Sequence, residues 1–587
     1  MNQWWGSQTR ASRVAWLLLF ILAIFSVRLF YIQVIKHKEY LTKADNMQTD
    51  RQVLPAVRGQ IYVRDTDGNI APLVLNRTVY TLFADPSEVK DINKARELVR
   101  RVAGDKLVQK NDPLGKLGDK NRRYVVLAQE LTQQQAEAIR KEKLSGLGLK
   151  PASQRVYPEG ALAAQTLGFV NSDGKGQYGV EQALDGRLGG KAGLLKTVTD
   201  VSKVPLTIGT NDVSIPAKDG ENIVLSIDRN VQSQAEETLA AGLKDAKATT
   251  GSMVVMDPQT GRVLAMANFP SYNPEQYRKV DTPAVYKNNV TMNAYEPGSV
   301  MKLFTVGAGL DSGAITPRST FLDTGCVQVD DAKMCNVERN IDGKMMTPMN
   351  LLEYSLNTGA VWVLQQMGGG SINLAGRQKY YGYLTKNYRF NQPTGIELAH
   401  EADSVIFKPD MNRGPRVLYA NMTFGQGEQL TMIQVISAFS AVINGGNYYK
   451  PTVVLGSYDI NTNKLTEQKP QLLQGNVLAP QHSYDLRDML QQARYLGAKG
   501  KLRDNGYFVG GKSGTAQKID PATGKYSHTL TTGTYIGFGA DKTKVPKYAI
   551  MVRVDDAHNG GYAGSAAAQP IFDKMSNFMI QYQGVSK

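Results

Sequence analysis

The stretch Pro297-Gly-Ser-Val-Met-Lys-Leu-Phe-Thr-Val-Gly-Ala-Gly-Leu310 decides how this chain of 587 residues is interpreted. As a helix it would be apolar on nearly every face, which is typical of a buried helix, and Lys302 is its only charge. A residue three positions after Ser299 lies on the same side of a helix, so the lysine amine can reach the serine hydroxyl. Pro297-Gly298 indicates a chain reversal that places Ser299 at the positive end of the helix dipole.

Burial would allow Lys302 to act as a base toward Ser299. A buried lysine disfavours its charged form, so its amine can accept the serine proton and turn the hydroxyl into a nucleophile. The competing interpretation is a helix-capping serine beside a lysine whose stem covers apolar surface. That interpretation is the commoner one for an isolated S-x-x-K, so the rest of the chain has to decide.

A second motif, Ser355-Leu-Asn357, lies between two helix-like runs at 349–354 and 359–367. A turn there would project a hydroxyl that relays a proton and a carboxamide that binds a lysine and a substrate carbonyl. Helix capping explains the same residue types equally well.

A third motif, Lys512-Ser-Gly514, lies in an extended segment at 507–515. Strand-like segments follow at 534–539 and 547–554, which predicts an antiparallel meander. Its glycines let another backbone approach, so a peptide beside this edge gains main-chain hydrogen bonds while Lys512, Ser513 and Thr515 bind its terminal carboxylate. The alternative is a solvated edge whose charge discourages aggregation.

The order of the three motifs and their spacing, 56 residues from Ser299 to Ser355 and 155 from Asn357 to Lys512, are more specific than any motif alone. Together they are the signature of enzymes that acylate a serine with the help of a lysine. The chain resembles the class B, monofunctional penicillin-binding proteins, which are peptidoglycan D,D-transpeptidases of the cell-division or elongation type. The resemblance rests on the three motifs and on further segments along nearly the whole chain: Arg58-Gly-Gln-Ile61, Arg155-Val-Tyr-Pro158, Gly179-Val-Glu181, the hairpin at 251–267, Asn293-Ala-Tyr-Glu-Pro-Gly-Ser299 and Phe424-Gly-Gln-Gly427. Leu356 and Ser513 depart from the commonest family pattern at positions where members vary.

This resemblance implies an α+β fold and a role for each motif residue. The fold has a single N-terminal transmembrane helix, a mixed α/β pedestal domain and a penicillin-binding domain with a central antiparallel sheet flanked by helices. Ser299 attacks the penultimate D-alanine of a stem peptide, and the amine of a neighbouring stem peptide resolves the acyl-enzyme. The remaining roles are these: Lys302 is the base, Ser355 and Lys512 relay the proton, Asn357 orients Lys302 and the substrate, Ser513, Gly514 and Thr515 bind the substrate or a β-lactam inhibitor, and the backbone N–H groups of Ser299 and Thr515 form the oxyanion hole. No metal or organic cofactor is expected.

Other proteins share parts of this signature. A serine β-lactamase or a penicillin-sensing receptor carries all three motifs but needs no large pedestal behind one N-terminal anchor. Hydrolysis in some β-lactamases uses an extra glutamate, and here we interpret the nearby acids Glu296, Glu353 and Glu428 as loop or helix-surface charges. A catalytically silent scaffold would lose the nucleophile, whereas Ser299 and Lys302 are both present.

The N-terminus predicts a membrane anchor. Residues 14–35 are mostly apolar and would span about 33 Å as a helix, enough for a bilayer core of about 30 Å. A cleaved signal peptide is less consistent, because the apolar stretch is too long and no small-residue cleavage site follows it. We expect a cytoplasmic tail at 1–13, the anchor at 14–35, the pedestal at 36–218 and the catalytic domain at 219–587, outside the bacterial cytoplasmic (inner) membrane.

The composition of the chain limits the classes of molecule that we expect it to bind. The net charge is +15, but the basic residues are dispersed and no nucleic-acid motif is present, so we expect no nucleic acid. Cys326 and Cys335 lie nine residues apart in a predicted hairpin, and outside the cytoplasm they can form a disulfide. The resemblance implies a polytopic glycosyltransferase and other divisome or elongasome proteins as partners, and it favours a septal role.

Overall fold

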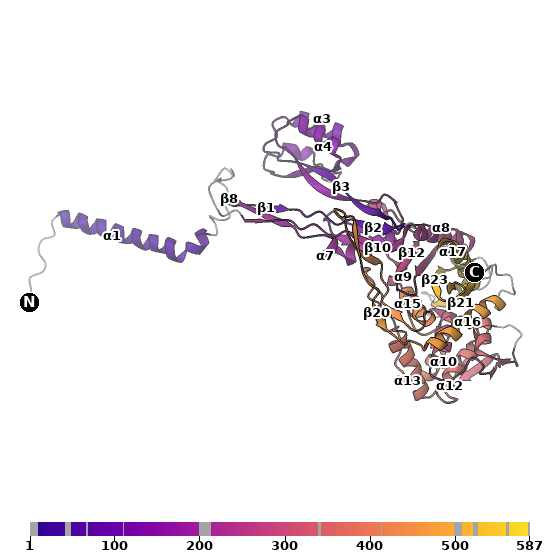
Figure 1. Cartoon of the computed structure of the whole chain (residues 1–587). Coiled ribbons are helices and arrows are strands. Elements are labelled where there is room, and N and C mark those ends of the chain that lie inside the picture. The colour runs from indigo at the N-terminus through magenta and orange to yellow at the C-terminus, as the bar shows by residue number, and fades with distance from the viewer. Residues whose placement is uncertain are drawn as a thin grey trace, which may run out of the picture. The chain divides into compact units, whose positions relative to one another are not determined.

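The computed structural model describes residues 10–41, 49–65, 68–109, 111–198, 213–337, 342–411, 414–497, 507–519, 526–558 and 563–584 (Figure 1). Its contacts define two compact units, Met1–Val57 with Gly189–Gly220, and Arg58–Leu188 with Glu221–Lys587. The predicted boundary between residues 218 and 219 stays a prediction, because these contacts group Arg58–Leu188 with the C-terminal part of the chain.

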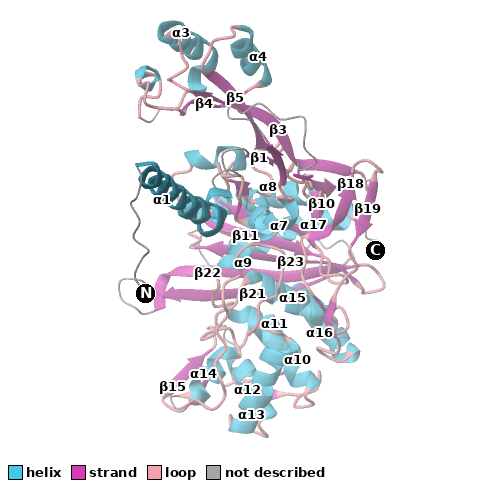
Figure 2. Ribbon diagram, turned by 90° about the vertical axis from the view of Figure 1, so that its left-hand side faces the viewer, coloured by secondary structure: helices cyan, strands magenta, loops and turns pink. Residues whose placement is uncertain are grey.

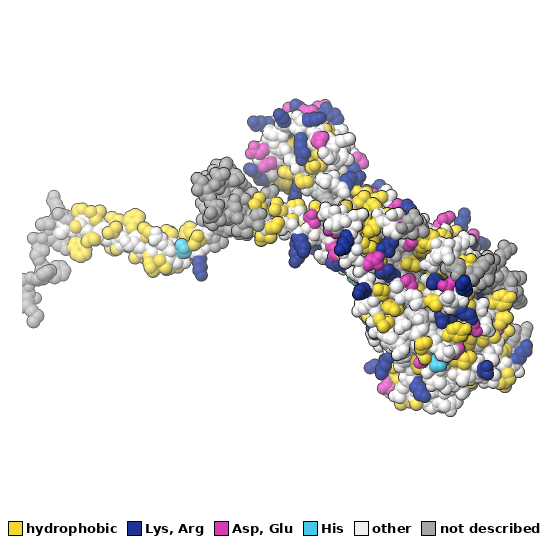
Figure 3. All heavy atoms as spheres, in the orientation of Figure 1, with side chains coloured by type: hydrophobic (Ala, Val, Ile, Leu, Met, Phe, Trp, Pro, Cys, Tyr) yellow, Lys and Arg dark blue, Asp and Glu magenta, His cyan; other side chains and the backbone are white. Residues whose placement is uncertain are grey.

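The first unit contains the apolar N-terminal helix. Helix α1 (Arg10–Phe30) continues into a π-helical turn, η1 (Tyr31–Ile35). Within it, Ser12–Ile35 has a mean hydropathy of 2.3 over its most apolar window and is long enough to cross a bilayer. Exposed hydrophobic side chains cover the helix (Figure 3), which fits a single-pass membrane anchor. The same unit holds the antiparallel strands β1 (Thr49–Leu54), β8 (Gly193–Val198) and β9 (Val213–Ile215).

The second unit is built around a five-stranded antiparallel sheet. Its strand order is β12-β11-β23-β22-β21, and Figure 2 shows β11, β23, β22 and β21 side by side. The predicted hairpin at 251–267 and the predicted meander are both present in it. The strands are β11 (Thr250–Met256), β12 (Val263–Phe269), β21 (Phe508–Ile519), β22 (Tyr526–Ala540) and β23 (Pro546–Asp555).

Alternating side chains of this sheet enter two different cores, as the two-residue period of a strand requires. Met253 and Val255 pack with helices α8 (Arg229–Asp245) and α17 (Gln569–Tyr582). Val254 and Met256 belong instead to the larger core on the other face. Helices that contribute to this core include α10 (Met301–Asp311), α11 (Pro348–Tyr354), α12 (Asn357–Met367), α13 (Leu374–Gly382), α14 (Pro415–Met422), α15 (Met432–Ile443) and α16 (Pro480–Gly497).

A seven-stranded sheet connects the pedestal to the catalytic part of the same unit. Strand β10 pairs in parallel with β2, while the other neighbours in this sheet are antiparallel. Its strands are β2 (Ile61–Arg64), β3 (Ile70–Ala84), β4 (Val125–Leu131), β5 (Leu147–Val156), β10 (Ile223–Asp228), β18 (Val454–Asp459) and β19 (Lys464–Glu467). The far end of β3, with β4 and β5, packs against helices α3 (Ile92–Ala103) and α4 (Gln133–Lys141) in a separate small core.

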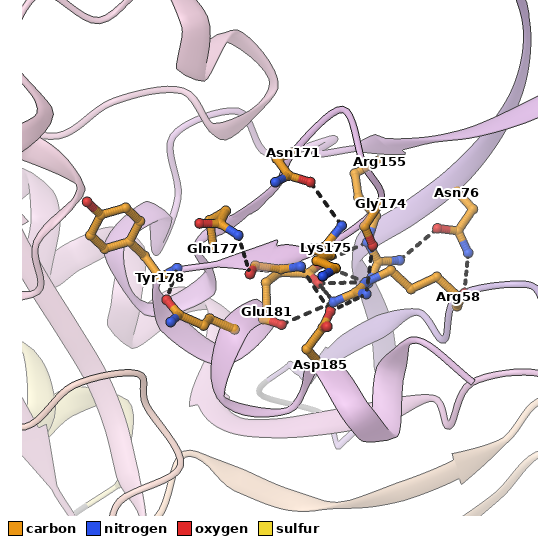
Figure 4. A network of polar contacts seen from close by, with 12 residues as sticks. Arg58, Asn76, Arg155, Asn171, Gly174, Lys175, Gln177, Tyr178, Glu181 and Asp185 are labelled. Atoms are coloured by element: carbon orange, nitrogen blue, oxygen red, sulfur yellow. Dashed lines mark hydrogen bonds and ion pairs between the residues drawn. The ribbon is translucent and has the colours of Figure 1, made fainter. Parts of the chain in front are cut away.

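The three pedestal segments singled out in the sequence meet in one buried ion cluster (Figure 4). Glu181 is fully buried and receives a 2.8 Å hydrogen bond from Nε of Arg58 and another from Nε of Arg155. Arg58 also donates to Asp185 at 2.6 Å. The cluster therefore joins residues from three distant segments of the chain.

Candidate active site

The nucleophile segment has the predicted local structure. A 3₁₀ turn, η6 (Gly298–Val300), leads into α10, whose residues Met301 to Leu310 are all buried. Ser299 makes no capping hydrogen bond at the start of α10, since the N-cap is Val300 and no side chain caps this helix. The capping interpretation of Ser299 is therefore wrong.

Lys302 is fully buried and its amine faces both serines of the predicted site. Its Nζ atom lies 2.9 Å from Oγ of Ser299 and 3.1 Å from Oγ of Ser355, and it donates to the Ser355 carbonyl at 2.5 Å. An amine held at this distance from a serine hydroxyl can accept its proton without a histidine.

Ser355 connects the second motif to the third. It ends α11 in the left-handed region, with φ of +57°, and this turn separates α11 from α12. Nζ of Lys512 lies 3.1 Å from the Ser355 hydroxyl, on the side of β21, so the hydroxyl lies between two lysine amines. Capping does not explain its position, because no side chain caps α12.

Asn357, the first residue of α12, has a different contact from the predicted one. Its Nδ2 atom donates to the carbonyl of Cys335 at 2.8 Å. Cys335 is joined to Cys326 by a disulfide across the antiparallel strands β14 (Cys326–Val329) and β15 (Ala332–Cys335). The hairpin is thus tied to the start of α12, and a direct role of Asn357 toward Lys302 or substrate stays a prediction.

Two glycines bring the first and third motifs into backbone contact. A Cβ atom on Gly298, whose φ is +62°, would lie 2.9 Å from the Thr515 carbonyl oxygen and 3.2 Å from its nitrogen. A Cβ atom on Gly514 would lie 2.7 Å from the Pro297 carbonyl oxygen. The backbones of η6 and β21 are therefore in contact. Ser299 follows Gly298 directly, and Thr515 is the residue that Gly298 faces.

A cleft of about 680 Å³ contains all the predicted site residues. Strand β21 is the edge strand of the central sheet, so it is open to pairing with an extended peptide. The predicted residues lining the cleft are Ser299, Lys302, Ser355, Asn357, Lys512, Ser513, Gly514 and Thr515. Among the described residues, no group of three or more His, Cys, Asp or Glu side chains could hold a metal ion.

Two charged residues line this cleft that sequence reasoning did not place there. Arg494 of α16 lines it and is held by the Tyr535 hydroxyl at 2.9 Å and by Asp573 at 2.9 Å. Glu353 of α11 also lines it. No sequence motif includes Arg494. Glu353 lies two residues before Ser355, and this position could have indicated that it lies near the site.

The predicted interpretation of the three nearby acids needs correction. Glu428 is fully buried and Glu296 partly so, and neither lines the cleft, while Glu353 does. Tyr295 and Leu430 exchange backbone hydrogen bonds of 3.0 Å, and this pairing carries Glu296 and Glu428 into the interior. Neither of these two is a surface charge.

Comparison with known proteins agrees with this geometry. Residues 251–577 match the penicillin-binding protein transpeptidase domain, and residues 53–225 match the penicillin-binding protein dimerisation domain. The chain belongs to the penicillin-binding transpeptidase family. The family resemblance predicted from the motifs is thereby confirmed.

Individual relatives align over most of their length. The chain is 29% identical to stage V sporulation protein D of Bacillus subtilis, covering 98% of this chain and 86% of that protein. It is 26% identical to the probable peptidoglycan D,D-transpeptidase PenA of Neisseria meningitidis, covering 98% and 94%. Penicillin-binding protein 2X from Streptococcus thermophilus has the same fold, with a TM-score of 0.71 at 22% identity over 92% of this chain and 81% of that one.

Proposed function

We propose that this protein is a membrane-anchored peptidoglycan D,D-transpeptidase in which Ser299 forms the acyl-enzyme. The hydrogen-bonded series Ser299, Lys302, Ser355 and Lys512 carries the proposal. It supplies a nucleophile, a base and a route for the proton, all inside one cleft. Membership of the penicillin-binding transpeptidase family supports the choice of stem peptides ending in D-Ala-D-Ala as substrates and of β-lactams as inhibitors.

The proposed chemistry runs in two halves. Lys302 takes the Ser299 proton as Oγ attacks the penultimate D-alanine carbonyl, and the backbone N–H groups of Ser299 and Thr515 stabilise the oxyanion. The proton passes through Ser355, with Lys512 beside it, to the leaving D-alanine amine. In the second half an acceptor amine forms the new C–N bond and gives one proton to Lys302. The ester C–O bond breaks, and Lys302 passes that proton to the Ser299 oxygen.

The cellular role is part of the proposal. The N-terminal helix would hold the enzyme in the bacterial inner membrane with residues 1–13 in the cytoplasm and the catalytic domain in the periplasm. We propose a septal role with a polytopic glycosyltransferase and other divisome proteins. Depletion that produces filamentous cells supports this role, whereas rounded cells would assign the enzyme to elongation.

Covalent labelling tests the catalytic part. A fluorescent penicillin should label the full-length protein in detergent at one equivalent per chain, with the adduct on Ser299 and no labelling of Ser299→Ala. The ester should survive many minutes to hours, because a transpeptidase holds water off until an amine arrives. Rapid turnover of penicillin that depends on Ser299 would instead identify a β-lactamase.

A further inference from the structure

More basic than acidic side chains line the cleft. Among the described residues that line it, the cations are Lys302, Lys512 and Arg494, and the one acid is Glu353. Arg494 is already paired with Asp573, and among the described side chains that line the cleft only the Glu353 carboxylate can pair with an ammonium group. The position of this one acid therefore matters for any cationic ligand.

The proposed reaction needs both kinds of ligand, and the inference that follows rests on that proposed function. The donor peptide brings a terminal carboxylate, which suits Lys512 and its neighbours. The acceptor brings a primary amine, which is an ammonium ion at neutral pH. It has to enter the cleft and lose a proton before it can attack the ester.

Neighbouring polar groups orient the Glu353 side chain, which could contact the acceptor's ammonium group. It lies in the last turn of α11, two residues before Ser355, and it is half-buried. Oε2 accepts a 3.3 Å hydrogen bond from Nδ2 of Asn350, whose own Oδ1 is fixed by the Thr347 backbone N–H and hydroxyl at 3.1 and 2.9 Å. Oε1 of Glu353 accepts no hydrogen bond from the described residues.

We propose that Glu353 binds the ammonium group of the acceptor stem peptide and accepts its first proton. The neutral amine then attacks the acyl-ester carbon of Ser299, forming the C–N bond. As the C–O bond to Ser299 breaks, Lys302 passes the second amine proton to the serine oxygen. This half of the reaction releases one proton, from Glu353 to solvent, and it regenerates the free enzyme. The amine of the released D-alanine takes up one proton in water, so the complete turnover is balanced.

The buried acids near the nucleophile do not offer the same function. Glu428 is fully buried and Glu296 is engaged with the Gly427 amide and the Tyr526 hydroxyl. Neither lines the cleft, so an acceptor in it would meet Glu353 alone among these acids.

Partitioning of the acyl-enzyme tests this assignment. Full-length protein is given a thioester analogue of the stem peptide, and transfer to glycinamide is compared with transfer to hydroxylamine, which is uncharged at neutral pH, and with hydrolysis. Glu353→Gln should lower transfer to glycinamide about tenfold or more, the effect of losing a hydrogen bond to a charged group. Acylation by penicillin, hydrolysis and transfer to hydroxylamine should stay near wild type, and Glu353→Asp should restore part of the glycinamide transfer.

Two controls separate the outcomes. Glu237→Gln, which changes an exposed acid of α8, should leave every rate unchanged. Equal losses with glycinamide, hydroxylamine and water would overturn the proposal, because Glu353 would then assist any nucleophile or merely shape the cleft. Unchanged glycinamide transfer in Glu353→Gln would also overturn it. Failure of the wild type to acylate at Ser299 would refute the proposed function itself, which is a different result.

Discussion

Glu428 lies close enough to Glu296 for the charge of one carboxylate to disfavour the charge of the other. Glu428 is fully buried, and neither of its carboxyl oxygens has a hydrogen-bond partner in the described part of the chain. Burial first, and the charge of Glu296 second, raise the pKa of Glu428 well above its usual range. At a pH between the unfolded and folded pKa values, Glu428 is therefore protonated in the folded protein and ionised in the unfolded chain.

This relationship predicts a pH-dependent stability. A carboxyl pKa that is raised by folding contributes stability below its unfolded value, and the contribution is lost as pH rises through the folded value. Glu428→Gln has the same shape and no proton to lose, so its Tm should exceed that of the wild type at pH 8, and the difference should shrink toward pH 4.5. Each kcal/mol corresponds to about 2 to 4 °C. Thermal unfolding at several pH values measures it, with exposed Glu237→Gln as the control. A constant Tm difference across this range would contradict a titrating Glu428.

The backbone contact between η6 and β21 predicts that one methyl group added at Gly298 strongly lowers the rate of penicillin acylation. Gly298→Ala places a Cβ atom 2.9 Å from the Thr515 carbonyl oxygen, so one of the two segments has to move. We expect penicillin acylation to fall about 100-fold, the size of losing an oxyanion donor. Gly313→Ala is the matched control, because its φ of +69° is similar and nothing lies within 4 Å of the added atom. It should lower stability by about 1 kcal/mol and leave acylation intact. Equal acylation rates in the two variants would show that the contact does not matter.

The elements predicted from the sequence are those with a strong local pattern. The apolar run after Ser299 forms α10, and the glycine-rich segment with its two strand-like partners forms β21, β22 and β23. The hairpin of Cys326 and Cys335 also follows from alternation. In each of these, neighbours in sequence determine the structure.

The features that could not be predicted depend on residues far apart in the chain. Glu428 looks like a surface acid until the segment of Leu430 pairs with that of Tyr295. The lysine- and glycine-rich composition of 104–121 is typical of a surface loop, yet Leu114 and Leu117 enter the small core between β3, β4, β5, α3 and α4. Arg494 reaches the cleft through the packing of α16, which no local pattern indicates.

The ion cluster of the pedestal predicts a large loss of stability from one substitution. Glu181→Ala leaves Arg58 and Arg155 buried without their shared partner. Breaking a buried pair in this way costs about 3 to 5 kcal/mol. Glu275→Ala is the control, because its contact with Arg77 is exposed and 3.5 Å long, and exposed pairs contribute about 0 to 1 kcal/mol. Denaturant unfolding compares the two, and similar losses would contradict a structural role for the cluster.

Lys302 provides a test in which activity and stability change in opposite senses. Lys302→Met keeps the length of the buried side chain but removes the amine that faces Ser299 and Ser355. Acylation by penicillin should fall about 100- to 10,000-fold, the usual contribution of a general base. The Tm should stay equal or rise, because a fully buried amine is costly to the fold and is retained for chemistry. Lys333→Met, at an exposed position on the Cys326 to Cys335 hairpin, should label like the wild type. A folded Lys302→Met protein that acylates at the wild-type rate would exclude this lysine as the base, and a large fall in Tm would show that its amine is structural.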